Sequence, residues 1–199
     1  MNFLAHAYLS FDYTDILIGN MISDYVKGKK KFDYSAEIQS GIMLHRMIDE
    51  FTDNHPATKL AKEYFKPAYR LYSGAMVDVV YDHFLALDKK QFAHENALLE
   101  FTTAVYTRLE INLVNLPEPF QKTFPYMKKN NWLYNYRFKW GIEKSFEGVR
   151  YRAKYISETN TAFAIFNDHY ESLQESYDLF FPELLAFVKQ QLFGSLRAK

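Results

Sequence analysis

Apolar residues recur at intervals of three or four along most of the chain, which is the period of an amphipathic α-helix. Residues 35–51 show the pattern well, because Ile38, Ile42 and Ile48 fall on one face and Ser35 can cap the N-terminus. Similar spacing predicts helices over residues 14–26, 74–88, 91–110, 130–147 and 160–193. Another predicted helix begins at Pro56 and is broken or kinked near Pro67, and the helix 160–193 is expected to be kinked or split at Pro182. Pro117, Pro119 and Pro125 predict a loop or a short helix.

No stretch of six residues alternates convincingly between polar and apolar positions, so the pattern predicts no strands. Glycine (7) and proline (6) are too few for the many tight turns of an all-β chain of 199 residues. No linker, repeat or low-complexity segment interrupts the sequence. We therefore predict an all-α fold in which residues 1–199 form a single helical domain.

Composition excludes several classes of protein. Lys+Arg and Asp+Glu number 24 each, and this balance is unlike the basic excess of a general nucleic-acid binder. The absence of cysteine excludes disulfides, zinc–thiolate sites and a cysteine nucleophile. The first basic residue is Lys27 and no apolar run approaches the ~18 residues of a membrane span, so we expect no signal peptide, no membrane contact and a cytoplasmic protein.

Histidines and acids stand at helical spacing within apolar segments. His45 and Asp49 are four residues apart and share one helix face, as do Asp78 and Asp82, with His83 next to Asp82. Two further polar residues within apolar segments are Asp24 and His6. Imidazole and carboxylate groups on facing helices are how helical domains build metal sites, and a divalent ion can activate water for phosphoester hydrolysis.

Each of these residues also has an ordinary structural explanation. Taken alone, the pair His45–Asp49 is explained by a surface ion pair or by a core histidine with a satisfied proton. The pair Asp78–Asp82 is explained by a solvated helix face, and His6 by a core histidine that is hydrogen-bonded to a backbone carbonyl. The basic run Lys27, Lys29, Lys30 and Lys31 is typical of a solvated loop. Spacing alone therefore supports a metal site only weakly.

Several motifs resemble those of the acyl carrier protein phosphodiesterases, also called ACP hydrolyases. The matching segments are the opening Met1-Asn2-Phe3-Leu4-Ala5-His6, Gly19-Asn20, Asp24-Tyr25-Val26-Lys27-Gly28, Gly41-Ile42 with His45-Arg46 and Ile48-Asp49, Thr52-Asp53-Asn54, and Asp78 with Asp82-His83-Phe84-Leu85. A thinner resemblance continues through Trp132-Leu133, Tyr136-Arg137, Gly148, Arg152, His169-Tyr170 and Phe181-Pro182. The resemblance covers nearly the whole chain and is most specific in its first 90 residues.

This resemblance implies a helix bundle distantly related to the HD-domain phosphohydrolases, and a divalent cofactor, typically Mn²⁺, with Mg²⁺ possible. The implied reaction is hydrolysis of the phosphodiester between 4′-phosphopantetheine and a serine of holo-acyl carrier protein (holo-ACP). The resemblance also implies a connection with fatty acid biosynthesis. Here Asp82-His83 reverses the order of the HD dyad, and a helical turn separates His45 from Asp49.

Resemblance and residue chemistry together yield an expected site. The expected metal ligands are His6, Asp24, His45, Asp49, Asp82 and His83, among which Asp24, His45 and Asp49 are also expected to be catalytic. The expected substrate-binding residues are Lys27, Lys29, Lys30, Arg46, Asn54 and Arg152, with Lys31 and Arg150 as further parts of a basic rim for acidic ACP. Two alternatives stay open: an HD-like phosphohydrolase of a small nucleotide or phosphate ester, and a non-catalytic module that docks ACP.

Overall fold

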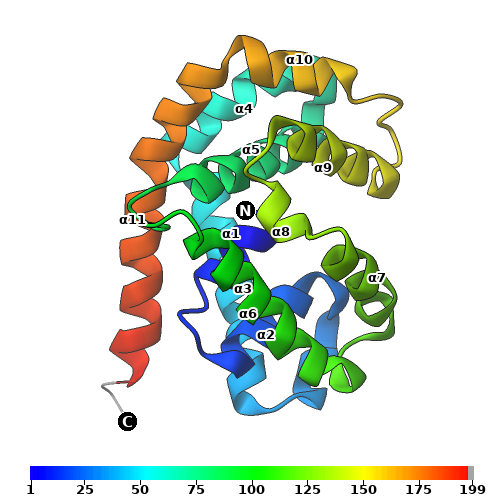
Figure 1. Cartoon of the computed structure of the whole chain (residues 1–199), viewed down its shortest axis with the longest axis vertical. Helices are drawn as coiled ribbons and strands as arrows, with labels where there is room; N and C mark the ends of the chain where they lie inside the picture. The colour runs from blue at the N-terminus through cyan, green and yellow to red at the C-terminus, as the bar shows by residue number, and fades with distance from the viewer. Residues whose placement is uncertain (197–199) are drawn as a thin grey trace.

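The chain folds into helices packed side by side (Figure 1), as a computed structural model of residues 1–196 shows, with no strand in that range. The α-helices are α1 (Phe3–Tyr8), α2 (Thr14–Ile22), α3 (Ala36–Asn54), α4 (Pro56–Tyr69), α5 (Ser73–Leu87), α6 (Ala97–Ile111), α7 (Glu118–Lys129), α8 (Trp132–Asn135), α9 (Lys139–Arg152), α10 (Asn160–Asp168) and α11 (Tyr170–Leu196). Short 3-10 helices are η1 (Ser23–Tyr25), η2 (Gly28–Asp33), η3 (Arg70–Tyr72) and η4 (Leu113–Asn115). The all-α prediction is confirmed.

The helix boundaries differ from the predicted ones at several points. The predicted helix 14–26 ends as α-helix at Ile22 and continues as η1, and the predicted helix 130–147 is interrupted between α8 and α9. Residues 160–193 are divided at His169 rather than at Pro182, which lies inside α11. Proline removes one backbone donor, but packing along the rest of a long helix can outweigh that loss.

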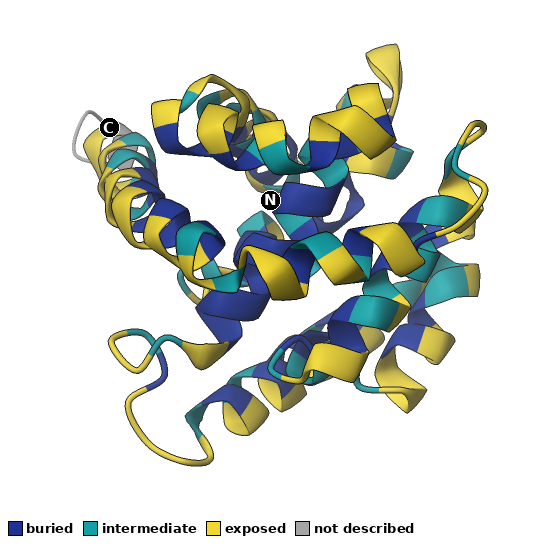
Figure 2. Cartoon of the chain, turned by 90° about the horizontal axis from the view of Figure 1, so that it is seen from above, coloured by how far each residue is buried: buried dark blue, intermediate teal, exposed yellow. Residues whose placement is uncertain are grey.

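One continuous hydrophobic core joins helices from both ends of the described chain. Buried positions line the inner faces of the helices while the outer faces are exposed (Figure 2). Helix α1 lies near the centre, where Leu4 and Ala5 are fully buried and α2 and α5 pack against it. Because α1 is so enclosed, polar groups at its N-terminal end must find partners inside the protein. In the part of the chain that the structure describes, helices long and apolar enough to cross a bilayer are absent.

Two glycines bring α2 and α3 into backbone contact. A Cβ atom on Gly19 would lie 2.1 Å from the carbonyl oxygen of Ile38, and one on Gly41 would lie 2.4 Å from that of Ile16. Only glycine permits this approach. The contact fixes α2 against the first half of α3, about one helical turn before His45.

Candidate active site

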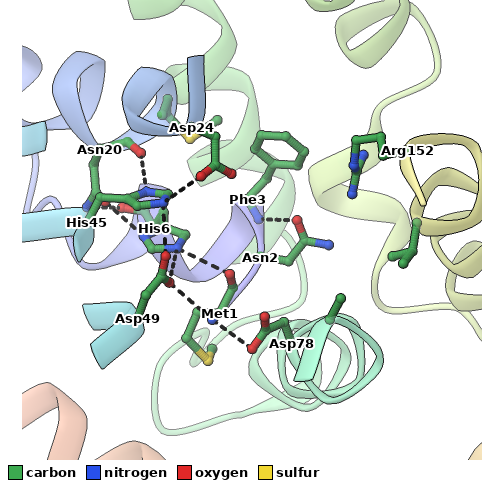
Figure 3. Close-up of a pocket in the computed structure, with 13 residues that line it drawn as sticks. Met1, Asn2, Phe3, His6, Asn20, Asp24, His45, Asp49, Asp78 and Arg152 are labelled. Carbon is green, nitrogen blue, oxygen red and sulfur yellow. Dashed lines mark hydrogen bonds and ion pairs between the residues drawn. The ribbon is translucent and has the colours of Figure 1, made fainter. Parts of the chain in front are cut away.

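Four of the six expected metal ligands converge on one pocket between helices (Figure 3). His6 comes from α1, Asp24 from η1, and His45 and Asp49 from α3. The pocket has a volume of about 160 Å³. His6 Nε2 lies 3.2 Å from Asp49 Oδ1, and His45 Nε2 lies 3.2 Å from Asp49 Oδ2. Asp24 Oδ1 lies 3.5 Å from His45 Nε2, on the solvent side of the site.

The two imidazole rings lie face to face, with centroids 3.8 Å apart and an angle of 14° between the rings. Both side chains are almost fully buried, whereas Asp49 is 42% exposed and Asp24 is 75% exposed. The two imidazoles therefore form the buried side of the site, and the two carboxylates form the side that a substrate can reach.

Asn20 determines which ring nitrogen of each histidine carries its proton. Its amide Nδ2 donates to the backbone carbonyl of His6 at 2.8 Å, so its side-chain oxygen must face His6 Nδ1, also at 2.8 Å. The backbone oxygen of Asn20 lies 2.7 Å from Nδ1 of His45. Both Nδ1 atoms are therefore donors, which leaves the lone pair of each neutral ring on Nε2. Such a hydrogen bond to the far ring nitrogen is how proteins orient metal-binding histidines.

Burial and neighbouring charge act in opposite senses on the two histidines. Burial, together with the nearby His45, lowers the pKa of His6 to about 4. Burial also acts to lower the pKa of His45, but hydrogen bonds and charge from Asp24 and Asp49 outweigh it and raise that pKa to about 9. Burial acts to raise the pKa of Asp49, and the two histidines outweigh it and hold the carboxyl well below its usual range.

The donor set fits a divalent cation. Nitrogen and oxygen atoms of His6, His45 and Asp49 all lie within 4.8 Å of one another. Neutral His6 presents its Nε2 lone pair to two acceptors, Asp49 Oδ1 and the Met1 carbonyl oxygen, each at 3.2 Å. A lone pair facing acceptors is unfavourable unless a proton or a cation lies between them. Two imidazoles and a carboxylate are ligands that transition-metal ions accept.

Asp82 lies outside this cluster, so the structure does not bring this expected ligand to His6, His45 and Asp49. Its carboxylate accepts hydrogen bonds from the backbone N–H groups of Asn2, Leu4 and Ala5 at 3.2, 2.7 and 3.3 Å. These are donors at the N-terminus of α1, where an intrahelical partner is missing. Asp82 therefore anchors the helix that carries His6.

His83, another expected ligand, also lies outside the cluster. Its Nδ1 lies 2.6 Å from the Tyr136 carbonyl oxygen, and its Nε2 lies 3.0 Å from the Tyr170 hydroxyl. Burial lowers its pKa to about 4, so it is a neutral core histidine at neutral pH. Neighbouring residues of an α-helix point about 100° apart, which is why Asp82 contacts α1 while His83 contacts Tyr136 and Tyr170.

Replacing Asp82 with asparagine is expected to lower the free energy of unfolding by about 2 kcal/mol or more, because an amide group would leave buried N–H donors of α1 without an acceptor. Urea denaturation would measure the loss, with exposed Asp168→Asn as the control. An Asp82→Asn protein as stable as the wild type would show that this carboxylate does not hold α1.

The expected substrate-binding residues are dispersed. Lys27, Lys29 and Lys30 are exposed around η2, where Arg46 donates to the Val26 carbonyl oxygen at 3.3 Å. Asn54, at the end of α3, donates from its side-chain amide to the Glu50 carbonyl oxygen and lies outside the pocket. Arg152 of α9 does line the pocket, across Asn2 and Phe3 from the histidines (Figure 3).

Sequence comparison places these residues in a known family. A family model described as acyl carrier protein phosphodiesterase matches residues 1–184. The chain belongs to the acyl carrier protein phosphodiesterase family. The protein of that name from Enterobacter sp. (strain 638) is 31% identical over 191 residues, which cover 96% of this chain and 99% of the relative. The Yersinia pestis protein is 32% identical over 185 residues, covering 93% and 96%.

No solved structure matches the chain significantly, so the relation to HD-domain phosphohydrolases stays a prediction. The expected site left out two residues that the structure of this acyl carrier protein phosphodiesterase family member places in it. Asn20 orients both histidines, and Asp78 accepts a hydrogen bond from the Met1 amino group at 2.9 Å inside the pocket. The signals were present, because Asn20 follows the packing glycine Gly19 and Asp78 is a polar residue in an apolar helix.

Proposed function

We propose that this protein hydrolyses the phosphodiester that joins 4′-phosphopantetheine to a serine of holo-ACP, releasing apo-ACP and free 4′-phosphopantetheine. The observation that carries the proposal is the full-length match to the acyl carrier protein phosphodiesterase family in a chain whose own residues form a His–His–Asp cluster. In this proposal the protein works in the cytoplasm on the carrier protein of fatty acid biosynthesis.

The proposal includes a divalent cofactor, Mn²⁺ with Mg²⁺ as a substitute, held by His6, His45 and Asp49. Support comes from the Nε2 atoms of the two histidines, each of which lies 3.2 Å from one oxygen of the Asp49 carboxylate. When bound, such an ion lowers the pKa of a water molecule and neutralises charge on phosphoryl oxygens. Asp49 would offset the positive charge, and Asn20 would keep both rings aligned.

Asp24 is suited to take the proton from the attacking water. The hydrogen bond with His45 is the largest of the causes that hold the Asp24 pKa below its usual value, so this carboxylate is ionised at neutral pH. It is also more exposed than Asp49, the other acid among the four converging residues. Arg152, across the pocket, can pair with a phosphoryl oxygen and stabilise the charge that develops there.

The direct test is incubation of the purified protein with holo-ACP and Mn²⁺, with the mass of the carrier protein as the readout. Loss of the prosthetic group, stopped by EDTA and restored by Mn²⁺, is the expected result. A matched pair of variants, His45→Gln in the site and His94→Gln on an exposed turn, should lose and keep the activity respectively. Metal-dependent cleavage of small phosphate esters with holo-ACP untouched would contradict the proposal, as would ACP binding without hydrolysis.

Charge reversal of Lys29, Lys30 and Lys31 is expected to raise the KM for acidic holo-ACP about tenfold at low salt, with little change in kcat. These lysines follow Asp24 closely in the chain, so they can steer ACP toward the site although the net charge of the protein is zero. The effect should fade at ~0.15 M salt, where the screening length is about 8 Å. Kinetics over a salt series would measure it.

The control for this charge reversal is Lys89→Glu with Lys90→Glu, in the connection between α5 and α6 and outside the pocket. A triple variant with an unchanged KM at low salt would show that ACP does not approach over η2.

A further inference from the structure

A second and larger cavity adjoins the active-site pocket. This groove has a volume of about 640 Å³ and lies between η1, α7, α8 and α9 and the start of α1. Asn2, Phe3 and Arg152, which Figure 3 shows beside the histidine cluster, line both spaces, so the groove adjoins the active-site pocket. The active-site pocket, at about 160 Å³, has room for a phosphoryl group and little else. Any longer substituent on the phosphorus must therefore lie in the groove or in solvent.

The walls of the groove combine aromatic faces with small polar groups. Trp132, Trp140 and Tyr151 line it, and Trp140 and Tyr151 are 53% and 78% exposed. Exposed aromatic surface of this kind around a cavity is typical of a ligand site. Asn130 and Asn135 also line it, each with its Nδ2 bonded to a backbone carbonyl and its side-chain oxygen unpaired within residues 1–196. These oxygens can accept hydrogen bonds from N–H groups of a ligand.

Two glycines of α9 shape the groove. A Cβ atom on Gly141 would lie 1.9 Å from the Asn135 carbonyl oxygen, so this glycine permits the close packing of α8 on α9. Gly148 differs, because a Cβ atom there would find no atom closer than Arg152 Nη1 at 3.9 Å. A side chain at residue 148 would therefore project into open space in the groove, near its junction with the active site.

We propose that this groove binds the pantetheine arm of the substrate while Arg152 holds the phosphate at the junction. The inference rests on the proposed function and specifies how its substrate binds. The arm is an uncharged, linear chain with two secondary amides, a hydroxyl group and a dimethyl carbon. Amide N–H groups match the asparagine oxygens, and the methyl groups match the tryptophan and tyrosine faces. The one lysine of the groove, Lys144, is paired with Glu147 at 3.1 Å, which suits a neutral ligand.

Both tryptophans of the chain line this groove, so intrinsic fluorescence reports on it specifically. Titration of the protein with pantetheine, which lacks the phosphate, is expected to change the fluorescence saturably. AMP, which offers phosphate and an aromatic base but no pantetheine amide, should change it much less, and inorganic phosphate should not change it at all. An AMP response as strong as that of pantetheine would overturn the assignment.

The decisive variant is Gly148→Leu, which would fill part of the groove. We expect pantetheine binding to weaken about tenfold or more and the KM for holo-ACP to rise by a similar factor, with the melting temperature unchanged. Gly194→Leu is the matched control, because Gly194 is a glycine of α11 at which a Cβ atom would meet nothing within 4 Å. Tyr151→Ala, which removes an exposed wall of the groove, should weaken binding without any loss of stability.

These experiments test the assignment of the groove and the proposed hydrolysis of holo-ACP independently. If holo-ACP is hydrolysed while Gly148→Leu and Tyr151→Ala leave pantetheine binding and KM unchanged, the groove assignment is overturned and the proposed function stands. If pantetheine binds, and Gly148→Leu weakens its binding, but holo-ACP is not hydrolysed, the groove assignment is supported and the proposed function fails.

Discussion

Replacing Asp49 with asparagine is expected to abolish both Mn²⁺ binding and hydrolysis of holo-ACP. Asp49 touches both imidazoles, with each carboxylate oxygen 3.2 Å from one Nε2 atom. An amide in this position would remove the negative charge that offsets the cation and would place an N–H group opposite the Nε2 atom of one histidine. The loss in turnover should be about 100-fold or more. Titration of bound Mn²⁺ by electron paramagnetic resonance, alongside the rate, would measure both effects.

The control is Asp53→Asn, one turn further along α3, where the carboxylate is exposed and paired with Lys62 at 2.6 Å. This variant should bind Mn²⁺ and hydrolyse holo-ACP like the wild type. If Asp49→Asn instead kept a full equivalent of Mn²⁺ and normal turnover, the His–His–Asp cluster would not be the metal site.

Asp24→Asn is expected to lower kcat about 100-fold while the fold and the bound Mn²⁺ are retained. The side chain is 75% exposed and contacts His45 through Oδ1 at 3.5 Å, so its loss should cost little stability. It lies outside the His6–His45–Asp49 group, which favours the role of proton acceptor over that of metal ligand. Rate measurements with saturating holo-ACP, together with Mn²⁺ titration, separate the two roles.

Asp15→Asn, an exposed acid at the start of α2, is the matched control for Asp24. Activity of Asp24→Asn within about threefold of wild type would be too high for a lost general base. Loss of Mn²⁺ together with activity would make Asp24 a ligand instead.

The spacing of residues along one helix predicts contacts within that helix. His45 and Asp49 meet because they are four residues apart on α3, and Ser35 caps the same helix through a hydrogen bond from Ile38 N, as the pattern predicts. The same reasoning does not place Asp82 and His83, which the structure puts outside the cluster. The sequence contains no information on which of several buried acids will face a metal and which will hold a helix end, because both roles require burial and several hydrogen bonds.

The sequence by itself determined the helical fold, the His45–Asp49 pair and, through resemblance, the family. Helical periodicity is local, since it depends on residues three and four apart. The resemblance named His6 and Asp24 beside that pair, but only the tertiary structure decided which of the expected ligands lie together, that Asn20 orients both rings, and that a groove opens beside them. These contacts join segments far apart in the chain. They depend on how closely α2 packs on α3 at Gly19 and Gly41, and on Asp82 holding α1 in the core.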